Sequence, residues 1–245
     1  MRLLFVADLH YALKQFDWVV GQAGAFDCVM IGGDLLDLGS GLDPDVQIVV
    51  VEKYLDRIAS QTRLIVSSGN HDGDARNEAD ESVARWLQEL RAPGRFVDGD
   101  RIELVGVGGW ISVCPWWDGP VTRATVEAQL ERDSRVASGR WIWIHHAPPS
   151  GSPVCWNGRK HIGDEALRGW IERFRPSLVF SGHIHNSPFY EEGAWVDRIG
   201  STWVFNPGRQ PGVQPTFIQV DLGTMTAEWS SAEGRSVRNL AVAER

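Results

Sequence analysis

Long apolar runs are missing from this chain of 245 residues, and cysteine is scarce. The three cysteines, Cys28, Cys114 and Cys155, are an odd number without close spacing, which excludes a disulfide framework or a zinc ribbon and suits a reducing compartment. No stretch approaches the ~20 apolar residues of a membrane helix. Only a short apolar run, Leu3–Ala7, precedes the first acidic residue, too short for the core of a signal peptide. We therefore expect a cytoplasmic protein with free thiols.

Positive charge is also in the minority. The chain has 24 lysines and arginines against 32 acidic residues, a formal net charge of −8. This balance opposes binding to a nucleic-acid backbone, so we expect a small-molecule partner and no membrane or nucleic-acid partner. The sequence indicates no oligomeric state. A hydrophobic content of 43% suits one large core. We predict a single domain over residues 1–230 and a polar, loosely held C-terminal tail over 231–245.

Short apolar segments predict the strands of the fold. Five of them are rich in β-branched or aromatic residues, as buried strands are: 3–7, 28–31, 64–66, 141–144 and 178–180. Four short antiparallel strands are expected in the C-terminal part: 195–199, 202–205, 216–221 and 225–229. Strand patterning alone thus predicts an α/β sheet with an antiparallel C-terminal part.

Helices and turns are predicted between these strands. Asp43-Pro44 is a strong helix start, and apolar residues then recur at helical spacing to about Ser60. Four further helices are expected over 13–25, 82–90, 121–136 and 164–174. Asp98-Gly99 predicts a two-residue hairpin turn between Phe96-Val97 and a strand over 101–105. After Gly109 we expect an irregular loop rich in tryptophan.

Polar residues that can bind metal follow each of the five buried strands. They are Asp8/His10, Asp34/Asp37, Asn70/His71, His145/His146 and His183/His185. Side chains at i and i+2 of a strand project to the same side, so Asp8 with His10, and His183 with His185, can each point at one place. Carboxylates, imidazoles and an amide oxygen suit manganese, iron, zinc or nickel. About seven ligands, with one carboxylate able to bridge, are enough for two divalent ions.

In this order, the motifs resemble those of the calcineurin-like metallophosphoesterase superfamily. The family pattern is Asp-x-His, Gly-Asp-x-x-Asp, Gly-Asn-His-Asp/Glu, a later His, and Gly-His-x-His. Here it is matched by Asp8-Leu9-His10, Gly33–Asp37, Gly69–Asp72, His145 and Gly182–His185. The resemblance implies an αββα fold, in which two mixed β-sheets pack face to face between helices.

The resemblance also implies residue roles. One ion would be held by Asp8, His10, Asp34 and His185, and a second by Asp34, Asn70, His145 and His183. Asp34 would bridge them. We choose His145 over His146 because the family's ligand is usually the first residue after the strand. His71 would face the scissile phosphate, oriented by Asp37.

The implied activity is metal-dependent hydrolysis of a phosphate mono- or diester, and we favour a phosphodiester of a small molecule. A nuclease of the same superfamily and a non-catalytic scaffold on the same fold are the alternatives. A protein Ser/Thr phosphatase fits less well, because Asp37 is followed by Leu38-Gly39 where those enzymes have Arg-Gly, and Ser68 replaces an arginine before Gly69.

Substrate-binding residues are left unassigned. Trp116 and Trp117 could stack on a planar substrate group, although hydrophobic packing is favoured for both. His146, His161 and Arg209 are further candidates for contact with substrate, each with a plain structural alternative. Asp72 is expected to cap or pair locally.

Overall fold

A computed structural model describes residues 1–136 and 138–241 as two mixed β-sheets packed face to face. The larger sheet has seven strands in the order β15 (Arg235–Asn239), β14 (Thr226–Ser230), β13 (Phe217–Asp221), β1 (Arg2–Val6), β2 (Cys28–Gly32), β3 (Arg63–Ser67) and β6 (Arg95–Phe96). The smaller sheet has six, in the order β11 (Val196–Ile199), β12 (Thr202–Phe205), β10 (Leu178–Phe180), β9 (Arg140–Ile144), β8 (Gly109–Val113) and β7 (Arg101–Glu103). A separate hairpin pairs β4 (Ala75–Arg76) with β5 (Ser82–Val83).

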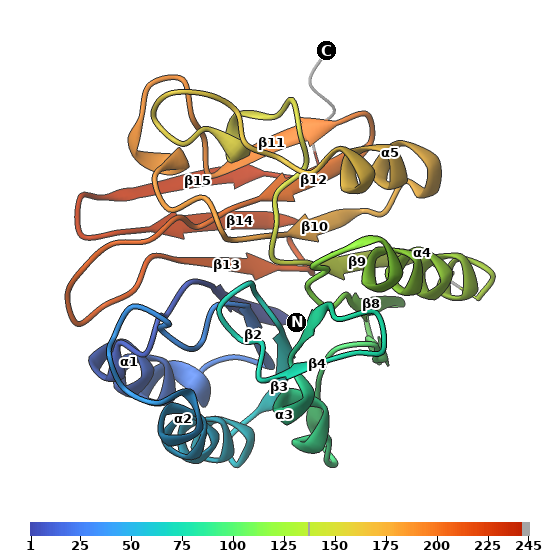
Figure 1. The fold of residues 1–245 in the computed structure, drawn as a ribbon. Helices are drawn as coiled ribbons and strands as arrows, with labels where there is room; N and C mark the ends of the chain where they lie inside the picture. Colours follow the sequence, from blue (N-terminus) through green and yellow to red (C-terminus); the bar gives the residue numbers. More distant parts are fainter. Residues whose placement is uncertain (137, 242–245) are drawn as a thin grey trace.

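Helices cover the outer face of each sheet (Figure 1). The larger sheet packs against α1 (Leu13–Ala23), α2 (Pro44–Ala59) and α3 (Arg85–Glu89). The smaller sheet packs against α4 (Pro120–Ser134) and α5 (Glu165–Phe174). Two single 3₁₀ turns, η1 (Pro153–Cys155) and η2 (Ser187–Phe189), lie in the loops. This is the αββα arrangement that the resemblance implies.

Strand alternation divides the core into an inner and two outer layers. In β1, Leu3 and Phe5 face the opposite sheet, whereas Leu4 and Val6 pack under the helices. In β9, the isoleucines face inward while Trp141 and Trp143 join the outer core with α4 and α5. Side chains that alternate in this way are fully buried on both faces, which explains the near-continuous apolar segments of the sequence.

Predicted helix starts at Asp43 and Asp164 are confirmed. The Asp43 carboxylate accepts a hydrogen bond from the backbone N–H of Asp45 at 2.9 Å. The Asp164 carboxylate accepts one from Leu167 at 2.7 Å. Both satisfy N–H groups that have no partner within their own helix.

The hairpin predicted at Asp98-Gly99 is wrong. Phe96, in β6, pairs with β3 of the larger sheet, and β7 pairs with β8 of the smaller one. Gly99 has the positive φ of 84° that a turn favours, but this turn carries the chain from one sheet to the other. The buried Asp98 carboxylate fixes the crossing by accepting a hydrogen bond from the Ser68 N–H at 2.9 Å.

Three other segments differ from expectation. The irregular loop predicted from Gly109 begins as β8, because Ile111 and Val113 enter the inner core. The helix expected over 82–90 is shorter, since its first two residues form β5. The polar tail expected from 231 includes β15, which pairs with β14 although its side chains are exposed. Residues 242–245 lie outside the described residues.

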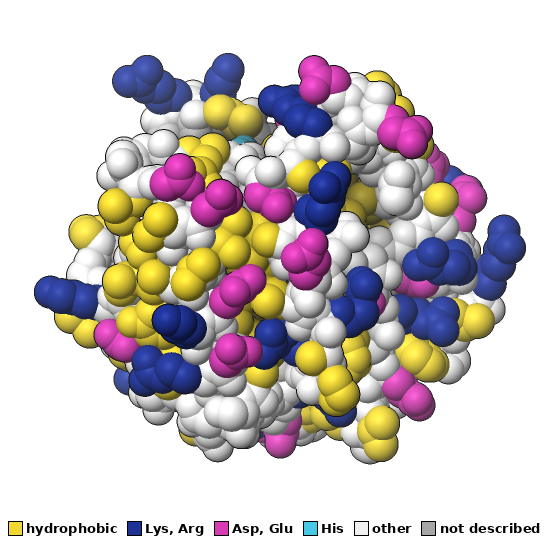
Figure 2. Space-filling view, turned by 60° about the horizontal axis from the view of Figure 1, so that its bottom comes forward, with side chains coloured by type: hydrophobic (Ala, Val, Ile, Leu, Met, Phe, Trp, Pro, Cys, Tyr) yellow, Lys and Arg dark blue, Asp and Glu magenta, His cyan; other side chains and the backbone are white. Residues whose placement is uncertain are grey.

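No helix in the described part of the chain has the length and apolar character needed to cross a membrane. Cys28, Cys114 and Cys155 are buried and free, as expected. Figure 2 shows one face of the molecule, on which basic and acidic side chains are interspersed and apolar side chains gather toward one side.

Candidate metal centre

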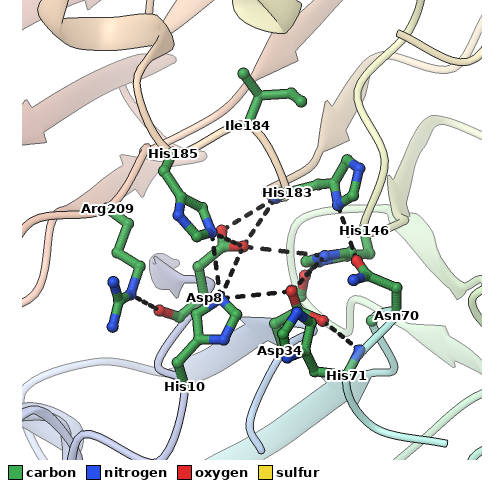
Figure 3. A network of polar contacts seen from close by, with 12 residues as sticks. Asp8, His10, Asp34, Asn70, His71, His146, His183, Ile184, His185 and Arg209 are labelled. Carbon is green, nitrogen blue, oxygen red and sulfur yellow. Dashed lines mark hydrogen bonds and ion pairs between the residues drawn. The ribbon is translucent and has the colours of Figure 1, made fainter. Parts of the chain in front are cut away.

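The ends of five strands bring a dense group of carboxylates and imidazoles together (Figure 3). β1, β2 and β3 run parallel in the larger sheet, as do β9 and β10 in the smaller one. Their carboxyl ends therefore meet at the seam between the sheets, the edge at which ligands bind in open α/β sheets.

The first cluster joins four residues: Asp8, His10, Asp34 and His185. Their ligand atoms lie within 4.8 Å of one another. His185 Nε2 is 3.2 Å from Asp8 Oδ1, and His10 Nε2 is 3.5 Å from Asp34 Oδ2. The structure thus brings together the four residues that the resemblance assigns to one ion.

The second cluster consists of Asp34, His146 and His183. His146 Nε2 lies 3.2 Å from Asp34 Oδ2, and His183 Nδ1 lies 2.8 Å from Asn70 Oδ1. Asn70 therefore lies on this side of the site. Asp34 belongs to both clusters, which is the arrangement a bridging carboxylate requires.

The structure does not bring His145 into either cluster, and His146 stands where His145 was expected. The His145 ring stacks on the Trp117 indole with centroids 3.8 Å apart. The reason is the alternation of β9: residue 146 continues the inward side of Ile142 and Ile144, whereas 145 continues the side of Trp143 toward the outer core.

His146 is oriented as a metal ligand would be. Its Nδ1 lies 2.7 Å from the Gly32 carbonyl oxygen, which can only accept a hydrogen bond, so Nδ1 carries the proton and Nε2 faces Asp34. Metal-binding histidines commonly donate their second N–H in this way. His146 Nε2 is buried and has no hydrogen-bond partner. The donor set and this unpartnered nitrogen fit a divalent metal ion.

Electrostatics in the site favour ionised carboxylates, a protonated His146 and neutral His10 and His183. Burial opposes ionisation of Asp34, but the nearby charge of His146 holds the pKa of the carboxyl well below its usual value. Burial lowers the pKa of His10 and of His183 to about 4. Burial would also lower the pKa of His146, yet the Asp34 carboxylate raises it to about 9. Neutral His10 and His183 keep the lone pairs that a metal needs.

The backbone at these strand ends is strained. Asp8, His10, Asp34 and His183 have positive φ values of 57°, 41°, 54° and 66°. Non-glycine residues adopt this region at a cost and cluster in it at functional sites. The turns aim the side chains back toward the seam.

Glycines of the motifs make room for the carboxylates. A Cβ atom at Gly69 would overlap Asp34 Oδ1. At Gly33, where φ is 90°, a Cβ would lie 2.6 Å from His146 Nδ1. The two backbones can therefore approach the ligands only because these residues lack side chains.

Asp72, which is expected to pair locally, does so with Gly69 and also reaches the Asp34 loop. Its carboxylate is fully buried and accepts hydrogen bonds from the N–H groups of Leu35, Leu36 and Gly69 at 2.8, 3.0 and 2.8 Å. Burial and the nearby charge of Asp34 raise the pKa of Asp72 to about 7. Asp72 thus ties the Asp34 loop to the Asn70 loop. The position of Asp72 in the Gly-Asn-His-Asp motif is the sequence signal that could have indicated this role.

His71 and Asp37 lie near each other and beside the first cluster. With His10 they form a third group of possible ligand atoms within 4.8 Å. The His71 N–H donates to Asp34 Oδ1 at 2.9 Å, and its ring lies edge-on to His10 at 4.6 Å. Asp37 Oδ1 accepts a hydrogen bond from Gly39, and no hydrogen bond joins the described Asp37 and His71 side chains.

The other residues considered for contact with substrate lie in different environments. Trp117 is buried in the outer core. Trp116 is half-buried and borders the centre, with its indole 5.5 Å from the His183 ring. His161 is exposed and packs on Trp156. Arg209 Nε donates to the Asp8 carbonyl oxygen at 3.0 Å and so supports a ligand loop (Figure 3).

Solved structures with this fold are diverse in sequence. The protein TT1561 of Thermus thermophilus is 15% identical, with a TM-score of 0.60 and coverage of 98% of each chain. A dimetal phosphatase from Danio rerio is 12% identical, with a TM-score of 0.57 and coverage of 96% of each chain. Purple acid phosphatase PPD1 from yellow lupin is 13% identical, with a TM-score of 0.56 over 98% of this chain and 52% of the other.

Sequence comparison identifies the family. A protein of Invertebrate iridescent virus 3, named as an inferred phosphoesterase (078R), is 22% identical over 206 residues. That match covers 79% of this chain and 55% of the relative, so the chain spans about half the length of the curated relative. Residues 1–187 match the family model described as calcineurin-like phosphoesterase. The chain therefore belongs to the calcineurin-like phosphoesterase family.

Proposed function

We propose that the protein is a phosphoesterase with two divalent metal ions, which hydrolyses a phosphodiester of a small molecule. The observation that carries the proposal is the position of Asp34 in both donor clusters. Asp8, His10, Asp34 and His185 would hold one ion, and Asp34, Asn70, His146 and His183 the other. The mixed oxygen and imidazole donors suit manganese, iron, zinc or nickel.

Bound metal ions would activate water and neutralise phosphoryl oxygens. The chain's own residues orient these groups. Asp72 and Arg209 hold the ligand loops from behind. His71, half-buried beside His10, would give a proton to the departing oxygen, a role worth about 10²–10⁴ in rate. Asp37 lies near enough to His71 to influence its orientation when substrate binds.

Preference for a diester is supported by the space beside the centre. A cavity lies next to Trp116 and Gly69, at the edge of the second cluster. A phosphodiester keeps a second ester group on phosphorus when the first one leaves, and this cavity offers space for it. A monoester has no second ester group to fill the cavity.

The proposal predicts metal-dependent hydrolysis. With added manganese, purified protein should cleave bis(p-nitrophenyl) phosphate faster than p-nitrophenyl phosphate, and excess EDTA should abolish both activities. Restoration by each metal in turn would rank manganese, iron, zinc and nickel. A protein that bound no metal and cleaved neither ester would favour the scaffold alternative. DNA affinity that rose steeply at low salt would favour a nuclease.

The assignment of His146 predicts different effects of two neighbouring substitutions. His146→Ala should weaken metal binding more than the roughly 10–100-fold that loss of an outer-shell partner causes, because it removes a ligand. His145→Phe should keep metal affinity close to that of the wild type, because its ring packs on Trp117. Isothermal titration with Mn²⁺ measures both. The reverse order of effects would restore His145 as the ligand.

A further inference from the structure

A partly open cavity of about 170 Å³ lies beside the metal centre. Its walls come from the β4–β5 hairpin, the first turns of α4 and Trp116. Gly69, which also lines it, directly precedes Asn70. Trp116 borders both places, because it lines the cavity and its indole lies 5.5 Å from the His183 ring. The cavity is therefore within reach of a group attached to a phosphate held at the metal centre.

The cavity walls are held together by specific contacts. Glu81, just before β5, accepts hydrogen bonds from the N–H groups of Val121 and Thr122 at the start of α4, at 2.8 and 2.6 Å. Asp118 accepts another from the Ser82 N–H at 2.8 Å. A carboxylate at a helix N-terminus is favourably placed. The hairpin and the helix thus form one fixed wall.

The residues that line the cavity favour an uncharged ligand group over a charged one. Among the described residues that line the cavity there is no lysine, arginine or histidine. Its single acid, Asp98, is buried and already accepts a hydrogen bond from Ser68. The remaining polar groups are neutral: they include Asn77, Ser82, Gln88 and Thr125. A second phosphate would find no positive partner here.

The aromatic lining residue and the volume of the cavity favour a ring. Trp116 offers a flat aromatic surface, and stacking on such surfaces is favourable for any planar base. Pockets for drug-sized ligands are roughly 300–1,000 Å³. The volume of about 170 Å³ is smaller and suits a single ring system with hydrogen-bonding edges.

We propose that this cavity binds an uncharged planar ring, such as a nucleobase, carried by the ester group that stays on the phosphate after hydrolysis. Trp116 stacks on the ring, and the neutral side chains of the hairpin and α4 meet its polar edges. The inference rests on the proposed function, because it names the substrate class of the same site.

Two esters with one leaving group test the proposal. Thymidine 5′-(p-nitrophenyl phosphate) and ethyl p-nitrophenyl phosphate both release nitrophenolate and differ only in the retained group. The wild type should favour the thymidine ester by about tenfold or more in kcat/KM. Thr125→Trp, which fills the cavity, should reduce this ratio to near one. Ala124→Trp, at the neighbouring exposed position of α4, should keep the wild-type ratio.

The outcomes separate this inference from the proposed function. Hydrolysis of both esters at equal kcat/KM would overturn the ring-binding cavity and leave the phosphodiesterase intact. An unchanged ratio in Thr125→Trp would overturn it as well. Hydrolysis of neither ester would contradict the proposed function. The cavity is then judged by NMR with thymidine itself: a shift of the Trp116 indole N–H signal that Thr125→Trp removes supports it, and no shift overturns it.

Discussion

Asp34→Asn is expected to abolish metal-dependent turnover while leaving the fold intact. The amide keeps an oxygen that can accept the hydrogen bond from the His71 N–H, so the loop retains its local contact. It loses the negative charge that both donor clusters share. Because a single lost electrostatic contact in an active site costs about 10²–10³ in rate, a shared ligand should cost more than about 10³ in kcat/KM.

Metal content and activity of Asp34→Asn are measured together, by elemental analysis and by hydrolysis of bis(p-nitrophenyl) phosphate. Asp17→Asn is the matched control, because the Asp17 carboxylate is 58% exposed and lies on the outer helix α1. It should keep wild-type metal content and rate. Near wild-type activity in Asp34→Asn would show that Asp34 is not the shared ligand.

Asp72→Ala is expected to give the largest loss of stability. The substitution leaves three buried N–H groups, at Leu35, Leu36 and Gly69, without their acceptor. Each unsatisfied buried donor costs about 1–3 kcal/mol, so we expect a loss of about 3–5 kcal/mol after relaxation. The variant should also bind metal poorly, because two ligand loops lose their connection.

Urea unfolding of the metal-free protein in EDTA measures this loss without a contribution from metal binding. Asp17→Ala, at a position 58% exposed on the outer helix α1, should stay within about 1 kcal/mol of the wild type. An equal, small effect of both substitutions would mean that Asp72 does not hold the loops together.

The strand ends were predictable from sequence because two independent signals coincide there. Buried strands demand apolar residues, and the ligands demand polar ones, so each boundary is sharp, as at Ile31-Gly32-Gly33-Asp34. The order of the motifs then identified the fold. Both signals depend on residues that are neighbours in the sequence, so they can be recognised without knowing how the chain packs.

Sheet pairing was less predictable because it depends on partners distant in sequence. Asp98-Gly99 has the residues of a tight turn, but burial of Phe96 against β3 and of Ile102 against β8 directs the two strands to different sheets. β15 lacks an apolar face altogether, and its backbone pairing with β14 defines it. No local sequence pattern predicts the separation of β6 and β7 into two sheets or the pairing of β15 with β14.

The alternation of side chains along β9 could have decided between His145 and His146 from the sequence. Ile142 and Ile144 are the inward residues of β9, and the same period places His146 inward and His145 beside Trp117. The cavity near Trp116 was beyond sequence reasoning, because a distant hairpin and the start of α4 form it together.

The candidate ligands come from both sheets: Asp8, His10, Asp34 and Asn70 follow strands of the larger one, and His146, His183 and His185 follow strands of the smaller one. Metal ions held between them would act as cross-links between two layers that otherwise meet through inner-core contacts such as Phe5 with Phe180, whose ring centroids are 5.0 Å apart. Since a ligand that binds only the folded state stabilises it, metal uptake would add to the stability that the inner core already provides. Metal supply would then raise the free energy of unfolding as well as the activity.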